Sequence, residues 1–155
     1  MLTEPRQSKC RCMLISPDRK ATLPKILVID DDAEIRDLIS CILEIEGYSV
    51  SVAEDGISGV ARYNAELPDL IITDMVMPGQ GGAETISIIL RETPDARIIA
   101  ISGGGRLDET NPLKTAEMLG AVGTLRKPFT VTELLDCVTR TLSRSPVQIN
   151  QHSAV

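Results

Sequence analysis

Histidine and tryptophan are almost missing from this 155-residue sequence. His152, close to the end of the chain, is the single histidine, and there is no tryptophan. Catalysis by histidine, the usual general acid or base near neutral pH, is therefore not expected. Ligand binding cannot be followed by tryptophan fluorescence.

Long apolar runs and an excess of positive charge are missing as well. No run approaches the roughly 20 apolar residues of a membrane-spanning helix, and the first 24 residues are polar with three prolines, unlike a secretion signal. The net charge is −6, whereas nucleic-acid-binding surfaces cluster Lys and Arg. We therefore expect a cytoplasmic protein with no membrane insertion and no nucleic-acid partner, suited to basic partners or a cation.

Four cysteines are present, two in predicted helices and two near the N-terminus. Cys41 and Cys137 fall on apolar helix faces, which predicts small core residues. Cys10 and Cys12 form a single C-x-C motif without a second pair or a nearby histidine, so a zinc site is not expected there. We interpret these two as exposed thiols on a tail. The first dozen residues are themselves uncertain as translated sequence, because Met13 is an alternative start.

Five short apolar segments alternate with five segments of helical periodicity. The segments over 25–30, 69–74 and 96–102 read as buried strands, the one over 48–53 as a strand nearer an edge, and the one over 121–128 as a short fifth strand. Apolar residues at helical spacing predict these inward-facing positions: Ile35, Leu38, Ile39, Ile42, Leu43, Ile57, Val60, Ala61, Ala83, Ile86, Ile89, Leu90, Val131, Leu134, Leu135, Val138 and Leu142.

Local signals mark where the predicted helices begin and end. Gly47 ends the first helix, Asn111 caps a helix that starts with proline, and Thr130 with Glu133 forms a capping box. Alternating strands and helices predict an α/β domain, a doubly wound parallel sheet between two helical layers. We place this domain at residues 24–143, with flexible tails over 1–23 and 144–155 that lack periodicity.

Polar residues follow the strands at their carboxyl ends, where open parallel sheets bind ligands. The run Asp30-Asp31-Asp32 follows the first strand, Asp74 ends the third, Ser102 ends the fourth and Lys127 follows the fifth. We expect them to form one site. Clustered carboxylates repel, and a hard divalent cation such as Mg²⁺ neutralises them.

The remaining groups of this site suit a phosphoryl group. A hydroxyl and an ammonium can hold phosphoryl oxygens, and an aspartate beside a metal can act as the nucleophile. The chemistry predicts an aspartyl phosphate on Asp74. Taken singly, each residue also has a structural explanation: a turn for Asp74, helix capping for the acidic run, a loop for Ser102 and a solvated charge for Lys127.

Four motifs, ILVIDDD, LIITDMVMPGQGG, IIAIS and LRKPFT, resemble in order and spacing the receiver domain of two-component response regulators. The resemblance covers residues 24–143. It implies a flavodoxin-like (βα)5 fold of five strands in the order 2-1-3-4-5. It also implies that Asp74 is the phosphoacceptor, that Ser102 is the switch hydroxyl and that Lys127 pairs with a phosphoryl oxygen, with a cis peptide bond to Pro128.

The same resemblance implies the magnesium ligands. Asp30 and Asp31 would be the acidic pair, with Asp31 the direct ligand, and the backbone carbonyl of Val76 would complete the protein's share. Asp74 would also be a ligand of the magnesium ion. Asp32 we interpret as solvated or as a helix cap.

Two positions depart from the family pattern. Thr124 stands where the family has an aromatic residue that follows the switch hydroxyl inward, and the loop after Ser102, with Gly103-Gly104-Gly105, is longer than typical. Three glycines would let this loop reorganise cheaply. A threonine cannot bury a ring, so the output change must be coupled differently or be weaker.

The sequence predicts a stand-alone response regulator, since the twelve residues after 143 are too few for an effector domain. It would take a phosphoryl group from a sensor histidine kinase or a histidine phosphotransfer protein, with Mg²⁺ as cofactor, and then bind a protein target. The resemblance assigns that target to the surface of the fourth helix, fifth strand and last helix. We expect no enzyme activity beyond its own phosphorylation and dephosphorylation.

Two alternatives stay open at this point. A small Mg²⁺-dependent phosphatase or phosphotransferase would also use a nucleophilic aspartate, but the second acid of its D-x-D motif is replaced by Val76. A pseudo-receiver would fold in the same way and act as an interaction module without phosphorylation. The intact acid pair, acceptor, hydroxyl and lysine argue against it.

Overall fold

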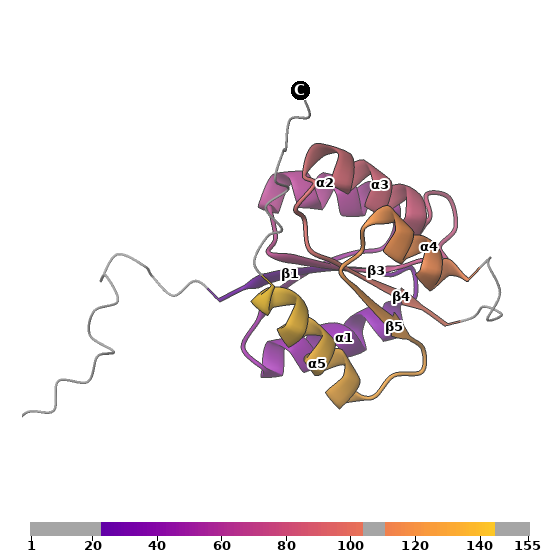
Figure 1. Cartoon of the computed structure of the whole chain (residues 1–155). Helices are drawn as coiled ribbons and strands as arrows, with labels where there is room; N and C mark the ends of the chain where they lie inside the picture. The colour runs from indigo at the N-terminus through magenta and orange to yellow at the C-terminus, as the bar shows by residue number, and fades with distance from the viewer. Residues whose placement is uncertain (1–22, 104–110, 145–155) are drawn as a thin grey trace, which may run out of the picture.

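Five strands form one parallel sheet with helices on both faces, as the computed structural model of the chain shows (Figure 1). The structure describes residues 23–103 and 111–144. The order across the sheet is β2-β1-β3-β4-β5, which confirms the predicted doubly wound, flavodoxin-like topology. The strands are β1 (Lys25–Ile29), β2 (Ser49–Ala53), β3 (Leu70–Asp74), β4 (Ile98–Ser102) and β5 (Gly123–Arg126).

The helices cover the sheet in two layers. Figure 1 shows α1 and α5 on one face of the sheet and α2, α3 and α4 on the other. The helices are α1 (Ala33–Ile45), α2 (Gly56–Glu66), α3 (Gly82–Glu92), α4 (Pro112–Leu119) and α5 (Val131–Ser143).

Each face of the sheet has its own core because successive strand residues point to opposite sides. In β1, Ile26 and Val28 pack with α1 and α5, whereas Leu27 and Ile29 pack with α2, α3 and α4. Strands β3 and β4 are buried along their whole length. Continuous β-branched runs are thus the correct signature of these central strands.

The predicted helix caps are confirmed. Asp32 is the N-cap of α1, where its carboxylate accepts the backbone N–H groups of Glu34 and Ile35. Asn111 caps α4 ahead of a proline, and Thr130 forms the capping box of α5. These bonds satisfy N–H groups that a helix end otherwise leaves unpaired.

Five inward positions were predicted wrongly, and one of them, Ala61 on α2, is exposed. Leu38, Ile57 and Val131 are 52%, 70% and 51% exposed, and Cys41 is also exposed. Leu38 and Cys41 are three residues apart and share the outer side of α1, while Ile57 and Val131 lie in first turns beyond the packed faces. Cys137 is buried, as expected.

Several predictions concern residues outside those that the structure describes. They are the two tails with Cys10, Cys12 and His152, and the glycines Gly104 and Gly105 of the loop. In the described ranges, no helix has the length and apolar character needed to cross a bilayer.

Candidate functional site

Asp74 is the last residue of the central strand β3 and is 7% exposed. The backbone N–H of Met75 bonds to the carbonyl of Ile101 on β4 at 2.8 Å, which fixes the strand beyond the acid. The N–H of Val76 donates to Asp74 Oδ1 at 3.5 Å. The carboxylate therefore stands at the carboxyl edge of the sheet, at the start of a turn.

Asp30 and Asp31 lie beside Asp74, although more than forty residues separate them in sequence. Carboxylate oxygens of the three acids lie within 4.8 Å of one another. Asp30 follows β1 and is 2% exposed, whereas Asp31 is open to solvent. The predicted acidic cluster is therefore assembled, with one exposed and two buried members.

Two neighbours hold Asp30 in place. The backbone N–H of Asp32 donates to Asp30 Oδ1 at 2.9 Å, and Arg36 donates from Nη1 to the Asp30 carbonyl at 2.6 Å. The sequence analysis missed Arg36, since an arginine in the first turns of a helix usually faces solvent. No sequence signal separates it from such a residue.

Lys127 reaches the cluster from the end of β5. Its Nζ lies 3.0 Å from Asp30 Oδ2 and 3.5 Å from Asp74 Oδ2. The peptide bond from Lys127 to Pro128 is cis, as predicted. The ammonium is thus placed between the acid of β1 and the acid of β3.

Burial raises the pKa of Asp74 above its ordinary value of 3.8, and the charge of Asp30 raises it further, while Lys127 acts to lower it. Burial acts to lower the pKa of Lys127, but its hydrogen bond to Asp30 and the charge of Asp74 outweigh that effect, and the pKa is raised above 10.5. The lysine therefore stays charged at neutral pH, and one ammonium faces three carboxyl groups.

The donor set fits a hard cation. Three carboxyl groups converge, one of them exposed, and the lysine supplies a single positive charge against them. Oxygen donors of this kind suit Mg²⁺, which keeps several waters and uses few protein ligands. Val76, proposed from the sequence as a carbonyl ligand, follows directly after Asp74 and Met75 and is 62% exposed. Its ligand role stays a prediction.

Ser102 ends β4 next to the acceptor. It is 2% exposed, and Ile101 before it pairs in register with Asp74. Its carbonyl accepts the backbone N–H of Lys127 at 2.9 Å, so the hydroxyl-bearing residue and the lysine are joined directly. All the residues predicted for the site therefore lie at one edge of the sheet.

Thr124, the departure from the family pattern, makes a bond of its own. Its hydroxyl donates to Glu117 Oε1 of α4 at 3.1 Å. The hydrogen bond joins β5 to α4. Side-chain pairs between separate elements cannot be read from one sequence, and this one was not predicted.

The doubly wound sheet carries three acids and a lysine at its carboxyl edge, the arrangement expected from the sequence for a receiver domain. The chain belongs to the response regulator receiver domain family, whose model matches residues 26–139. It is a receiver domain of the two-component type.

Curated relatives support the same assignment. Sporulation initiation phosphotransferase F of Bacillus subtilis is 32% identical over 118 residues, covering 76% of this chain and 93% of that protein. Nitrogen assimilation regulatory protein NtrX of Azorhizobium caulinodans is 35% identical over 119 residues, covering 76% of this chain and 26% of that protein. The chain spans 26% to 63% of the length of NtrX and of two transcriptional regulators from cyanobacteria.

Solved structures agree in fold. The receiver domain of NtrX from Brucella abortus superposes with a TM-score of 0.73 at 32% identity, covering 77% of this chain and 99% of that one. A receiver domain protein from Clostridium thermocellum superposes with a TM-score of 0.71 at 34% identity, covering 77% of this chain and 94% of that one.

Proposed function

We propose that this receiver domain accepts a phosphoryl group on Asp74 in the presence of Mg²⁺ and thereby changes its affinity for a protein partner. One observation carries the proposal: the Lys127 ammonium lies 3.5 Å from Asp74 and 3.0 Å from Asp30 inside a cluster of three carboxyl groups. A structural ion pair would need only one acid. The surplus acids suit a cation and a phosphoryl group together.

In the proposed transfer, a carboxylate oxygen of Asp74 attacks the phosphorus of a phosphohistidine. The new bond joins oxygen to phosphorus, and the phosphorus–nitrogen bond breaks with its electron pair going to the imidazole, which leaves and takes up a proton. Lys127 and Ser102 hold two phosphoryl oxygens and so offset the charge that develops on them. Asp30, Asp31 and the Val76 carbonyl would hold Mg²⁺, which when bound draws charge from the phosphoryl oxygens.

The output is proposed to run through β5 and α4. The phosphoryl group carries about 1.5 to 2 negative charges and replaces the single charge of the Asp74 carboxylate, so at most about one negative charge is added beside Lys127 and Ser102. This added charge favours one of two conformers of the adjoining segments. Because Thr124 is bonded to Glu117, a shift of β5 would move or break the contact with α4. A hydrogen bond thus replaces the buried ring as the coupling element.

The proposed phosphoryl donor is a sensor histidine kinase or a histidine phosphotransfer protein. The Bacillus subtilis relative, nearly all of whose length the chain matches, is named a phosphotransferase, and this name supports a place among phosphotransfer proteins. The single-domain organisation read from the sequence stays a prediction. We also predict that the protein does not hydrolyse small phosphoesters, because Val76 stands where a second acid would be needed.

Neighbouring acids provide a test of the metal site. Asp31→Asn is expected to weaken Mg²⁺ binding at least roughly tenfold, because the loss of a ligand should cost no less than the loss of a residue that orients one. Asp32→Asn is the matched control: it removes the same charge one residue on, and asparagine caps a helix as well as aspartate does. Isothermal titration calorimetry with MgCl₂ measures both affinities. Equal losses in the two variants would contradict the assignment of Asp31.

A further inference from the structure

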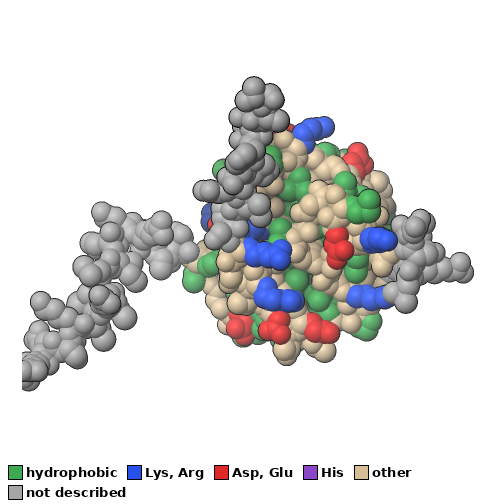
Figure 2. Space-filling view, in the orientation of Figure 1, with side chains coloured by type: hydrophobic (Ala, Val, Ile, Leu, Met, Phe, Trp, Pro, Cys, Tyr) green, Lys and Arg blue, Asp and Glu red, His purple; other side chains and the backbone are tan. Residues whose placement is uncertain are grey.

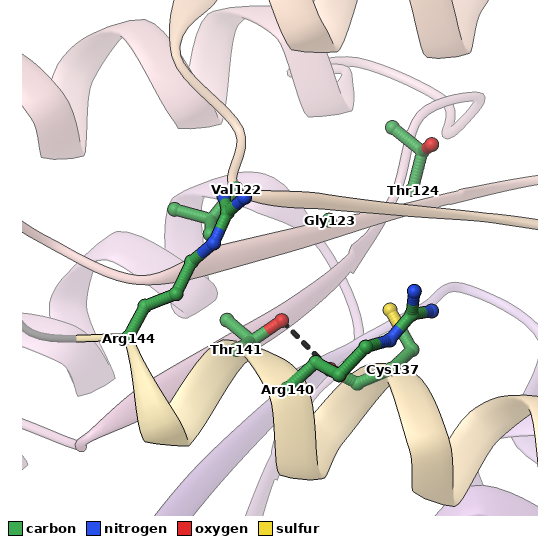
Figure 3. Close-up of a pocket in the computed structure, with 7 residues that line it drawn as sticks. All are labelled: Val122, Gly123, Thr124, Cys137, Arg140, Thr141 and Arg144. Carbon is green, nitrogen blue, oxygen red and sulfur yellow. Dashed lines mark hydrogen bonds between the residues drawn. The ribbon is translucent and has the colours of Figure 1, made fainter.

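A cavity of about 350 Å³ lies between the edge strand β5 and the C-terminal half of α5. None of its lining residues belongs to the acidic cluster. Gly123 and Thr124 line it from the strand, and Cys137, Arg140, Thr141 and Arg144 line it from the helix (Figure 3). Its volume falls within the range typical of small-ligand pockets, roughly 300 to 1,000 Å³.

The cavity is open because the strand contributes small residues. A Cβ atom at Gly123 would stand 3.0 Å from Cys137 Sγ and 3.2 Å from Thr141 Oγ1, so a side chain there would crowd the helix. Thr124 also lines the cavity, although its hydroxyl is bonded to Glu117 of α4, on the other face of the sheet. A second space lined by a different set of residues therefore exists beside the site already described.

Two guanidinium groups of the lining have no acidic partner among the residues that the structure describes. Within residues 23–103 and 111–144, neither Arg140 nor Arg144 forms an ion pair, and both are exposed. Arg140 donates from Nε only to the backbone carbonyl of Asp136, at 3.3 Å. Figure 3 shows Arg144 extending from α5 toward Val122, and the guanidinium of Arg140 beside the Cys137 sulfur.

A third guanidinium strengthens the positive charge at this end of α5. Arg97 donates from Nε and Nη2 to the carbonyl of Arg144, at 3.2 and 2.9 Å. It thereby covers a carbonyl at the negative end of the helix dipole, which would otherwise disfavour an anion. Figure 2 shows Lys and Arg side chains gathered over this part of the surface. On a chain of net charge −6, this end of α5 is a local concentration of positive charge, which can attract an anion.

We propose that this cavity binds a small, compact anion that carries phosphate or carboxylate groups, held by the guanidiniums of Arg140 and Arg144. The hydroxyl protons of Thr124 and Thr141 are already donated to Glu117 and to the Cys137 carbonyl, so the guanidiniums supply the charged donors. The described residues that line the cavity include no aromatic ring, so they offer no stacking surface for a nucleobase. A compact polyanion fits this lining better than a nucleotide does.

Amide NMR of the full chain tests the proposal. Titration with pyrophosphate or with citrate in Mg²⁺-free buffer is expected to give saturable shifts of the Gly123 and Thr141 amides. The double variant Arg140→Gln/Arg144→Gln should bind the anion at least roughly tenfold more weakly than the wild type, because two charge-assisted contacts are lost. Arg91→Gln, which removes an exposed charge from α3, is the matched control and should bind as the wild type does. The tighter of the two probes identifies the ligand as a phosphate or a carboxylate.

The proposal is overturned if neither anion gives saturable shifts at Gly123 and Thr141. Shifts confined to Ser102 and Lys127, unchanged in the double variant, would place the anion at the acidic site and would also overturn it. Phosphorylation of Asp74 is a separate outcome, because the double variant should still be phosphorylated by acetyl phosphate at the wild-type rate.

Discussion

Replacing Lys127 by methionine is expected to lower the free energy of unfolding by about 2 kcal/mol near pH 7.5. The substitution leaves Asp30 and Asp74, 2% and 7% exposed, without their cation. Removing one partner from a buried ion pair costs about 3 to 5 kcal/mol. The smaller value is expected here because the lysine side chain is 20% exposed and water screens part of the interaction.

The loss of unfolding free energy in the Lys127 variant, relative to the wild type, should depend on pH in a defined direction. The pKa of Lys127 is raised in the folded protein, so its contribution is fully present below about pH 10.5 and is lost as the pH rises through the folded value. The pKa of Asp74 is also raised, so Asp74 takes up a proton at a higher pH than an ordinary aspartate does. As the pH falls through the raised pKa of Asp74, the lysine loses this charged partner, and the difference in unfolding free energy between the wild type and the variant should narrow.

Urea unfolding of both proteins, followed by circular dichroism at several pH values, measures this deficit. Lys114→Met is the matched control, because Lys114 is exposed on α4 and forms no ion pair within the described part of the chain. Its stability should stay within about 0.5 kcal/mol of the wild type. A deficit in the Lys127 variant that is the same at every pH would contradict the electrostatic account.

Gly82→Ser is expected to destabilise the fold by about 2 kcal/mol and to displace the acceptor. Gly82 opens α3, and its N–H donates to the Met75 carbonyl at 3.1 Å. A Cβ atom at this position would overlap the carbonyl oxygen of Asp74 and lie 2.6 Å from Met75 Cα. Both contacts are with backbone at the end of the central strand, which cannot yield as a flexible side chain can. Overpacking of this kind typically costs about 1 to 3 kcal/mol.

Gly81→Ser provides the matched control for Gly82→Ser. Gly81 is the N-cap of α3 and has no side-chain cap, and a Cβ atom there would meet the Met75 carbonyl oxygen at an ordinary 3.5 Å. Serine is a preferred N-cap, so we expect a change within about 0.5 kcal/mol, toward stabilisation. Thermal unfolding separates the two variants. Equal stability would show that α3 can move away from β3 at no cost.

The topology and the main residues of the site could be predicted because they depend on local and repeated signals. The alternation of Ile26 and Val28 with Leu27 and Ile29 fits a strand buried on both faces, and helices between such strands favour parallel pairing. The carboxyl ends of parallel strands share one edge, so Asp74 and Lys127 had to lie near each other. The order of the four motifs along the chain allowed the roles of the site residues to be predicted.

Contacts between side chains of separate elements could not be predicted in this way. The bond from Thr124 to Glu117 depends on how α4 sits against β5, and the bond from Arg36 to the Asp30 carbonyl depends on a rotamer. Helical periodicity also overestimates the buried face, as the exposed Leu38 shows. The cavity with Arg140 likewise arises from packing between β5 and α5, which a sequence pattern does not specify.

Intact-mass spectrometry after incubation with acetyl phosphate tests the central claim most directly. The wild-type chain should gain one phosphoryl group when Mg²⁺ is present and none when the metal is removed with EDTA. Asp74→Asn, shown to be folded by circular dichroism, should gain none in either condition. A folded wild-type chain that is never phosphorylated, or an Asp74→Asn variant that still is, would contradict the assignment of Asp74 as the phosphoacceptor.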